Sequence, residues 1–261
     1  MGFDLSKTRH ALVTGAAGAI GGALARELSA RSPEAILSLV DNDARGVEAL
    51  ARELGPRSRP LVWDLAHPDE LAAAYDTAAG DAPVDVLVNC AGIMELRSFV
   101  ATPWSLGSRL LAIDLLSPIR LMSLATPAMR SRGSGVVVNL ASMAAMLPIR
   151  GSSFYGAAKA GLAMASEIAR IELAAAGVQV LTVYPGPVAS GLERHARAQV
   201  KRSWIARALP TGEAVPLAER IVRAIEQSAS RVVYPPVYVV AARAMGLARV
   251  FTEHLSPATL E

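Results

Sequence analysis

The chain has 261 residues, of which 52% are apolar and 19% charged, and 26 Lys and Arg against 23 Asp and Glu leave a formal charge of +3. This composition can bury a sizeable core and excludes a disordered chain, which needs low hydrophobicity and high net charge. The longest stretch without a charge, 173–192, is interrupted by glycines and prolines, so we expect no transmembrane segment. Most arginines alternate with acids along the sequence, which argues against a nucleic-acid partner.

Two further features indicate a cytoplasmic protein. Cys90 is the only cysteine, so no internal disulfide can form. Residues 1–7 contain no apolar core of a signal peptide. Both features are typical of a chain that folds in a reducing compartment.

Short apolar runs alternate along the chain with longer helical patterns. We expect strands at 9–14, 35–41, 59–64, 84–89, 135–141, 178–184 and 231–234, and helices at 18–30, 44–54, 68–79, 103–131, 153–176 and 214–229. Continuous hydrophobicity in the strands indicates burial on both faces. The sequence therefore predicts a single α/β domain over 1–261, with a doubly wound parallel sheet of about seven strands and helices on both faces.

A glycine-rich turn, T-G-A-A-G-A-I-G, follows the first strand. Its glycines allow a sharp turn and a close approach to a pyrophosphate, which the free N–H groups at the start of the next helix attract. Small residues packed at a strand–helix junction are the structural alternative. The position after the first strand favours a Rossmann-type dinucleotide site, with contacts from Thr14, Gly15, Gly18, Ala19, Ile20 and Gly21.

Two acids predict how the adenosine end of the dinucleotide is held. Asp41 ends the second strand, where a carboxylate accepts hydrogen bonds from both ribose hydroxyls and repels a 2′-phosphate. NAD is therefore favoured, although Arg45 lies near enough to leave NADP open, and Asp41 could instead cap the strand end. Asp64 and Leu65 follow the third strand and are expected at the adenine, unless Asp64 forms a turn that caps the next helix.

A candidate catalytic group lies in Y-G-A-A-K, where Tyr155 and Lys159 are neighbours on one helical face. The ammonium favours the phenolate and is expected to lower the pKa of Tyr155, which makes this tyrosine a general acid and base for an alcohol or carbonyl oxygen. Ser142 ends the fifth strand, so its hydroxyl lies at the same ligand-binding edge. A surface pair of no consequence is the alternative.

These motifs, in this order, resemble the short-chain dehydrogenase/reductase family in its single-domain branch. The resemblance implies reversible hydride transfer between a nicotinamide and a secondary alcohol or ketone. It implies that Tyr155 exchanges the proton, Ser142 steadies the substrate oxygen and Lys159 binds the nicotinamide ribose. It also implies assembly as homodimers or homotetramers, often through the helix that carries Tyr155, and further cofactor contacts from Asn89, Ala91, Gly92, Pro185, Gly186, Val188 and Ser190.

The chain departs from the family pattern at two positions. Cys90 replaces the second of two asparagines and is expected to be a core residue. Asp114 stands where the family has its fourth catalytic residue, an asparagine whose main-chain carbonyl holds a water linked to Lys159. Pro118 has no N–H to occupy the carbonyl of Asp114, so we expect this water relay to survive. An ionised Asp114 would also offset part of the field of Lys159 on Tyr155, unless it is a solvated helix residue.

The substrate side is less defined. Apolar residues after the central strands predict a pocket for a small, hydrophobic substrate, or else they only pack: Met94, Ala144, Met146, Leu147 and Pro187. A lid is expected at 189–213, and its segment 192–207 has a net +4 from Arg194, Arg197, Lys201, Arg202 and Arg207 against Glu193. The charge fits a solvated face, or attraction of an anionic substrate, a carrier protein or a membrane surface. His195 has no partner ligands, so no metal site is expected.

The apolar segment 234–255 is expected to close the pocket or an interface rather than to insert into a bilayer surface.

Three functions follow. The favoured one is an NAD(P)-dependent oxidoreductase acting on an apolar secondary alcohol or ketone. The second is a 3-oxoacyl thioester reductase, for which the cationic lid would dock an acyl carrier, although Asp41 argues against the NADPH such an enzyme would use. The third is a nucleotide-binding redox sensor without turnover, which has no need of Ser142, Tyr155 and Lys159 together.

Overall fold

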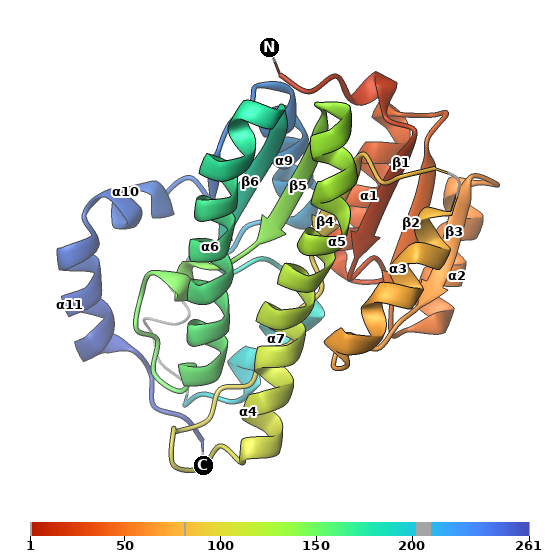
Figure 1. Ribbon diagram of the computed structural model, residues 1–261. Coiled ribbons are helices and arrows are strands. Elements are labelled where there is room, and N and C mark those ends of the chain that lie inside the picture. Colours follow the sequence, from red (N-terminus) through yellow and green to blue (C-terminus); the bar gives the residue numbers. More distant parts are fainter. Residues whose placement is uncertain (1, 81, 202–209, 261) are drawn as a thin grey trace.

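In the computed structural model, which describes residues 2–80, 82–201 and 210–260, seven parallel strands form one sheet in the order β3-β2-β1-β4-β5-β6-β7 (Figure 1). The strands are β1 His10–Thr14, β2 Ile36–Asp41, β3 Ser58–Val62, β4 Val86–Asn89, β5 Gly135–Leu140, β6 Val178–Pro185 and β7 Arg231–Tyr234. The chain reverses direction across the sheet between β1 and β4, which pair directly. This topological switch point confirms the doubly wound α/β prediction.

Helices cover both faces of the sheet (Figure 1). One core lies under α1 (Ala19–Arg31), α2 (Ala44–Leu54) and α9 (Ala214–Glu226). The other lies under α3 (Leu71–Ala79) and α5 (Ser117–Arg132), with α6 (Ser153–Leu173) packed beside α5. All residues of β1, β4 and β5 are buried, which explains their uninterrupted hydrophobic runs.

The strand β3 differs from its prediction. It begins at Ser58 and ends at Val62, and most of it is exposed or half-buried. The reason is its place at the edge of the sheet, where only β2 pairs with it. Pro60 fits this place, because an edge strand can dispense with one N–H.

The predicted helix 103–131 is a continuous segment with a local irregularity. It consists of α4 (Trp104–Leu111), a π-helical turn at Ala112–Leu116 and α5. In this turn the N–H of Ser117 donates to the carbonyl of Ala112. Within the described residues, 104–132 is the one helix long and apolar enough to cross a membrane, but half of its most apolar window is buried inside the fold, as in a core helix.

Three helices correspond to the predicted lid and the apolar tail. The predicted lid contains α7 (Gly191–Ala198), which follows β6, whereas Arg202 and Arg207 lie outside the described residues. The apolar tail, for which no helix was predicted, forms α10 (Tyr238–Arg243) and α11 (Met245–Leu255), which follow the edge strand β7. These two helices project beside the end of the sheet that carries β6 and β7 (Figure 1), and no residue of either is fully buried.

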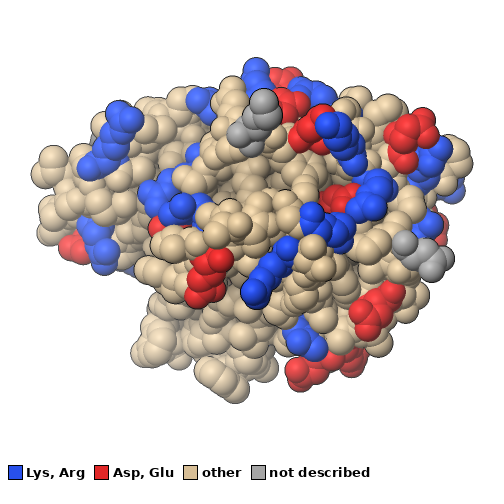
Figure 2. Space-filling view, turned by 45° about the horizontal axis from the view of Figure 1, so that its top comes forward, with Lys and Arg blue, Asp and Glu red and all other residues tan. Residues whose placement is uncertain are grey.

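Charges on the surface are mixed in sign. Figure 2 shows basic and acidic side chains interspersed over one face. Several form ion pairs between elements distant in sequence, among them Arg26–Glu53, Arg31–Glu226, Arg57–Glu34 and Arg9–Asp85. These pairs bring cations and anions of the nearly balanced set, 26 Lys and Arg against 23 Asp and Glu, into contact on the folded surface.

One buried histidine links the sheet to the loop before β4. His10 is fully buried, with Nε2 2.9 Å from Ser38 Oγ and Nδ1 2.6 Å from the carbonyl oxygen of Ala82. Burial lowers the pKa of His10 from its ordinary value of 6.5. The unfolded chain therefore binds a proton at His10 at a higher pH than the folded chain does.

We predict that this difference makes the fold less stable as the pH falls below about 6.5, by up to about 1.4 kcal/mol per pH unit until the folded pKa is reached. His10→Gln should remove this contribution, and urea denaturation at a series of pH values would show a shallower pH dependence. His254→Gln, at an exposed position of α11, is the control. Equal slopes for His10→Gln and wild type would contradict the prediction.

Candidate active site

A cavity of about 400 Å³ lies at the carboxyl ends of β1, β2 and β4, at the switch point of the sheet. Much of the cofactor site predicted from the sequence lines it: Gly15, Gly18, Ala19, Ile20, Gly21, Asp41, Asp64, Leu65, Ala91, Gly92 and Ser190. Sequence reasoning missed other lining residues, including Ala17, Trp63 and Ile113. Only the fold brings these close, although Trp63 precedes the predicted Asp64.

The glycine loop fits a pyrophosphate. Gly15 has φ of 69°, and a Cβ there would lie 2.7 Å from the backbone nitrogen of Ala91. A Cβ on Gly21 would lie 2.1 Å from the carbonyl oxygen of Gly15. The helix α1 starts after Gly18 with no side-chain cap, so its first N–H groups are left for an anion.

The adenosine end of the cavity is acidic. Asp41 Oδ2 accepts from the N–H of Ala17 at 3.0 Å, and its Oδ1 accepts from the N–H of Asp43 at 3.1 Å, which fixes the carboxylate beside the glycine loop. Asp64 also lines the cavity, but its Oδ1 accepts from the N–H of Ala66, so it forms the turn expected as an alternative. Within the described lining there is no Lys or Arg, and Arg45 is not part of it.

Several predicted cofactor residues support the cavity instead of lining it. Thr14 Oγ1 accepts from the N–H groups of Cys90 and Ala91 at 3.1 and 3.2 Å, which ties β1 to the loop after β4. Asn89 is buried and donates to the carbonyl of Pro118 and to Asn139 Oδ1. Pro185, Gly186 and Val188 also lie outside the lining, beside α7 and α10.

The three residues of the predicted catalytic group meet at the end of β5. Tyr155 and Lys159 are 6% and 4% exposed, and Lys159 Nζ lies 5.8 Å from the centre of the Tyr155 ring. Lys159 also donates to the carbonyl of Leu140 at 2.9 Å. Ser142 forms a side-chain hydrogen bond with Tyr155 and accepts from the N–H of Ala144 at 3.1 Å. The group can therefore hold and move a proton at the tyrosine oxygen.

The ionisation of Tyr155 corrects one expectation. Burial raises the pKa of Tyr155, while Lys159 and the hydrogen bond from Ser142 lower it and Asp114 raises it further. The sequence predicted the effect of Lys159 correctly in direction, but burial outweighs it, so the pKa is raised rather than lowered. The protonated phenol is thus the favoured form in this structure.

The Asp114 side chain is fully buried in the π-helical turn, which excludes the solvated helix position. Its Oδ1 lies 3.1 Å from Lys159 Nζ, and its Oδ2 accepts from the N–H of Ile93 at 3.2 Å. The sequence indicated its influence on Lys159 but not the direct contact. Cys90 lines the cofactor cavity, and burial raises the pKa of its thiol to about 12, so the thiol stays neutral.

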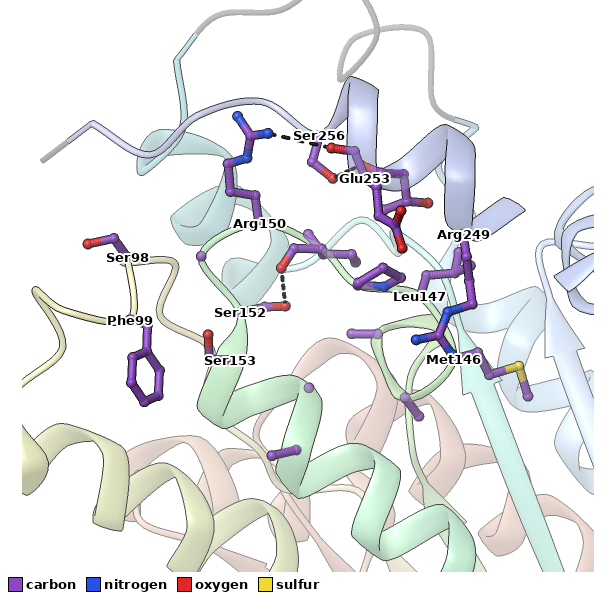
Figure 3. A pocket seen from close by; sticks show the side chains of 18 residues that line it. Ser98, Phe99, Met146, Leu147, Arg150, Ser152, Ser153, Arg249, Glu253 and Ser256 are labelled. Atoms are coloured by element: carbon purple, nitrogen blue, oxygen red, sulfur yellow. Dashed lines mark hydrogen bonds between the residues drawn. The ribbon is translucent and has the colours of Figure 1, made fainter. Parts of the chain in front are cut away.

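A second cavity, of about 600 Å³, lies beside the start of α6 (Figure 3). Of the predicted substrate residues, Ala144, Met146 and Leu147 line it, whereas Met94 and Pro187 do not. The opposite wall is polar and comes from α11, with Arg249, Thr252, Glu253 and Ser256 (Figure 3). The pocket is therefore not wholly apolar. In the sequence, the spacing of these four residues along one helical face was the signal that could have predicted this polar wall.

Polar contacts tie α7 to the segment after β4. His195 Nε2 lies 2.7 Å from Glu95 Oε1, and the N–H of Leu96 donates to Gln199 Oε1 at 2.8 Å. Arg197 pairs with Glu193 on the same helix, so one of the predicted lid cations is neutralised locally. No cluster of three His, Cys, Asp or Glu side chains suited to a metal occurs among the described residues.

Comparison with known proteins identifies the family. A family model described as short chain dehydrogenase matches residues 9–201. The chain belongs to the short-chain dehydrogenase family. It is therefore a nicotinamide-dependent oxidoreductase that acts on CH–OH groups. This assignment agrees with the Rossmann-type sheet and the glycine-lined cavity described above.

Individual relatives of this short-chain dehydrogenase support the same assignment. Nodulation protein G of Rhizobium meliloti (strain 1021) is 38% identical over 194 residues, 73% of this chain and 77% of that protein. The cis-4-hydroxycyclohexanecarboxylate dehydrogenase of Sinomonas cyclohexanicum is 36% identical over 199 residues, 73% and 79% of the two chains. A short-chain dehydrogenase from Sphingobium yanoikuyae, solved in complex with NADPH, has a TM-score of 0.80 at 27% identity over 94% and 95%.

Proposed function

We propose that this short-chain dehydrogenase transfers hydride between NAD(H) and a secondary alcohol or ketone, with Tyr155 as the general acid and base. The observation that carries the proposal is the meeting of Tyr155, Ser142 and Lys159 at the edge of the sheet that also holds the glycine-lined cavity. A sensor without turnover has no use for this buried group. The 36% identical relative is named for the oxidation of a ring alcohol, which belongs to the same substrate class.

Each side chain has a distinct task in the proposed reaction. The bound nicotinamide supplies or accepts the hydride at the substrate carbon. In the reductive direction, Tyr155 donates its proton to the carbonyl oxygen while Ser142 holds that oxygen by a hydrogen bond. Lys159 stabilises the phenolate that forms. Of the three N–H donors of its ammonium, one bonds to the carbonyl of Leu140 and one lies at the carboxylate of Asp114, so the third is available to the nicotinamide ribose. Because Pro118 has no N–H to donate to the carbonyl of Asp114, this carbonyl is available to the water that returns the proton to Tyr155.

We propose that the chain forms one nucleotide-binding domain. The substrate is proposed to enter this domain between two of its segments. On one side lies α7, the described helix of the proposed lid at 189–213, which is tied through His195 to Glu95. On the other, residues 144–148 meet the polar face of α11, in the segment 234–255 (Figure 3). The proposed substrate therefore has an apolar carbon skeleton together with a polar group. The carboxylate of Asp41, fixed beside the glycine loop, opposes the 2′-phosphate of NADPH, so the 3-oxoacyl reductase is the less favoured alternative.

We predict that Tyr155→Phe lowers kcat by about 10²- to 10⁴-fold, because it removes the proton that the oxygen exchanges. The dissociation constant for NADH should change little, since the ring remains in place. Steady-state assays at the NADH absorbance with a panel of ketones and alcohols, and a fluorescence titration of NADH, measure the two quantities. Tyr75→Phe, at a buried tyrosine of α3, is the matched control. Undiminished turnover in Tyr155→Phe would refute the proposed function.

NAD is the proposed cofactor because Asp41, held by the N–H groups of Ala17 and Asp43, stands where a 2′-phosphate would meet its negative charge. We predict that Asp41→Asn raises the ratio of kcat/KM for NADP to that for NAD by about tenfold or more, about 1.4 kcal/mol. Asp43→Asn provides a comparison, since this carboxylate caps α2 through the N–H of Gly46 and should affect the ratio less. An unchanged ratio in Asp41→Asn would contradict this role.

A homo-oligomer is proposed through the face formed by α4 and α6. The small residues of α6 pack within the chain itself, since Ala158 is fully buried and Gly161 lies against Leu115. Large apolar side chains on the same helices are exposed instead: Trp104 by 72%, Met164 by 63%, Ile168 by 48% and Ile171 by 67%. Such a face fits a second copy of the chain.

We predict that Ile168→Glu reduces the mass of the particle in solution, because a buried unpaired charge opposes association. Light scattering coupled to size-exclusion chromatography measures this mass. Val215→Glu, at a 56% exposed position of α9 on the other side of the sheet, is the control and should leave the mass unchanged. A wild-type monomer, or an Ile168→Glu variant of unchanged mass, would contradict the proposal.

A further inference from the structure

A buried carboxylate lies next to the catalytic lysine. Lys159 is 4% exposed and Asp114 is fully buried, with 3.1 Å between Nζ and Oδ1. Burial is the largest single influence on the pKa of Lys159 and lowers it, but the carboxylate of Asp114, together with Tyr155 and Cys90, outweighs burial and raises this pKa. As seen from Tyr155, the carboxylate offsets part of the charge of the ammonium, which has the larger effect of the two.

The surrounding backbone is shaped to hold the carboxylate in this place. The N–H of Ile93, in the segment after β4, donates to Asp114 Oδ2 at 3.2 Å. Gly92 comes so close that a Cβ would lie 2.6 Å from Asp114 Oδ1. The π-helical turn at Ala112–Leu116 carries Asp114 to this position. Burial raises the pKa of Asp114 above its ordinary value, and two donors on different elements, the Lys159 ammonium and a backbone N–H, oppose this rise by favouring the ionised form.

The other groups around Tyr155 bring no further charge to it. Ser142, at the end of β5, is neutral and forms a hydrogen bond with Tyr155. Cys90, at the end of β4, faces Lys159 but stays a neutral thiol, because burial raises its pKa to about 12. Asp41, at the end of β2, acts on Cys90 and not measurably on Tyr155. The balance between Lys159 and Asp114 therefore decides the field at the tyrosine oxygen.

We propose that Asp114 is a positioning residue whose buried carboxylate fixes the Lys159 ammonium and offsets part of its charge, which adds to the effect of burial on Tyr155, so that Tyr155 serves mainly as a general acid. This inference rests on the proposed function and adds the favoured direction of proton transfer. A protonated Tyr155 donates to a carbonyl oxygen, so reduction of a ketone proceeds over a wide pH range. Oxidation of an alcohol needs the phenolate and is therefore confined to more alkaline pH. The overall equilibrium is unaffected, because a catalyst changes only rates.

The test removes the negative charge of the Asp114 side chain and keeps the shape of the surrounding site. Asp114→Asn is isosteric, and Asp114→Ser is a smaller neutral variant that creates no clash with Gly92. The ionisation of Tyr155 is measured by the tyrosinate absorbance as the pH rises, without substrate or cofactor. The absorbance of the same protein carrying Tyr155→Phe is subtracted, so that only the signal of Tyr155 is left. Asp76→Asn, at an exposed position of α3, removes the same charge far from the site and is the control.

We predict that the midpoint of Tyr155 ionisation falls by about one pH unit in both neutral variants, because Lys159 is then uncompensated. The pH profile of kcat should move in the same direction, with the rising limb for alcohol oxidation and the falling limb for ketone reduction both at lower pH. Asp76→Asn should leave both quantities unchanged. A midpoint that stays in place or rises in folded Asp114→Asn and Asp114→Ser overturns the proposal.

The ion pair itself has a separate readout. Asp114→Asn and Lys159→Met should each destabilise the fold, and the double variant should lose less stability than the sum, because neither partner is left as a buried unpaired charge. Additive losses in urea denaturation would show that the two side chains do not act as a pair and would overturn the proposal. Failure here is distinct from failure of the proposed function, which is decided by the turnover of Tyr155→Phe.

Discussion

The functional architecture depends on the join between β1 and β4 at the centre of the sheet. The backbones of the two strands pair directly, and Thr14 extends this join with one hydroxyl, which accepts from two successive N–H groups of the loop after β4. Gly15 allows the approach, because any Cβ at this position would collide with the backbone of Ala91. With the two strands held at this distance, their carboxyl ends open a cavity in which a helix start, a carboxylate and small residues converge.

Burial controls the chemistry on the other side of this cavity. It raises the pKa of Tyr155 and keeps the Cys90 thiol neutral, and it also acts to lower the pKa of Lys159. Asp114 opposes this effect on Lys159 through its ion pair, and at the same time it reduces the help that Lys159 gives to the phenolate. The site therefore combines a charged lysine with a protonated tyrosine, which suits a group that donates a proton to a developing alkoxide.

Much of the fold was predictable because its signals are local. Every predicted strand exists in the structure, and the bounds of α2 match the prediction at both ends. The exceptions have physical causes. The strand β3 is exposed because it has one neighbour, and α10 was missed because it is a short, largely apolar segment. In α11 the polar residues at helical spacing gave a signal, which the apolar reading of the whole tail overlooked.

The sequence by itself determined the order of the elements, the glycine loop, Asp41 and the spacing of Tyr155 and Lys159, because each depends on residues close together in the chain. Only the tertiary structure decided that Asp114 lies 3.1 Å from Lys159, that Asn89 braces the interior instead of lining the cavity, and that burial outweighs the ammonium at Tyr155. The physical reason is that burial and charge pairing are set by groups far apart in the chain, such as Asp114 and Lys159 at 45 positions, and no local pattern records the distance between them.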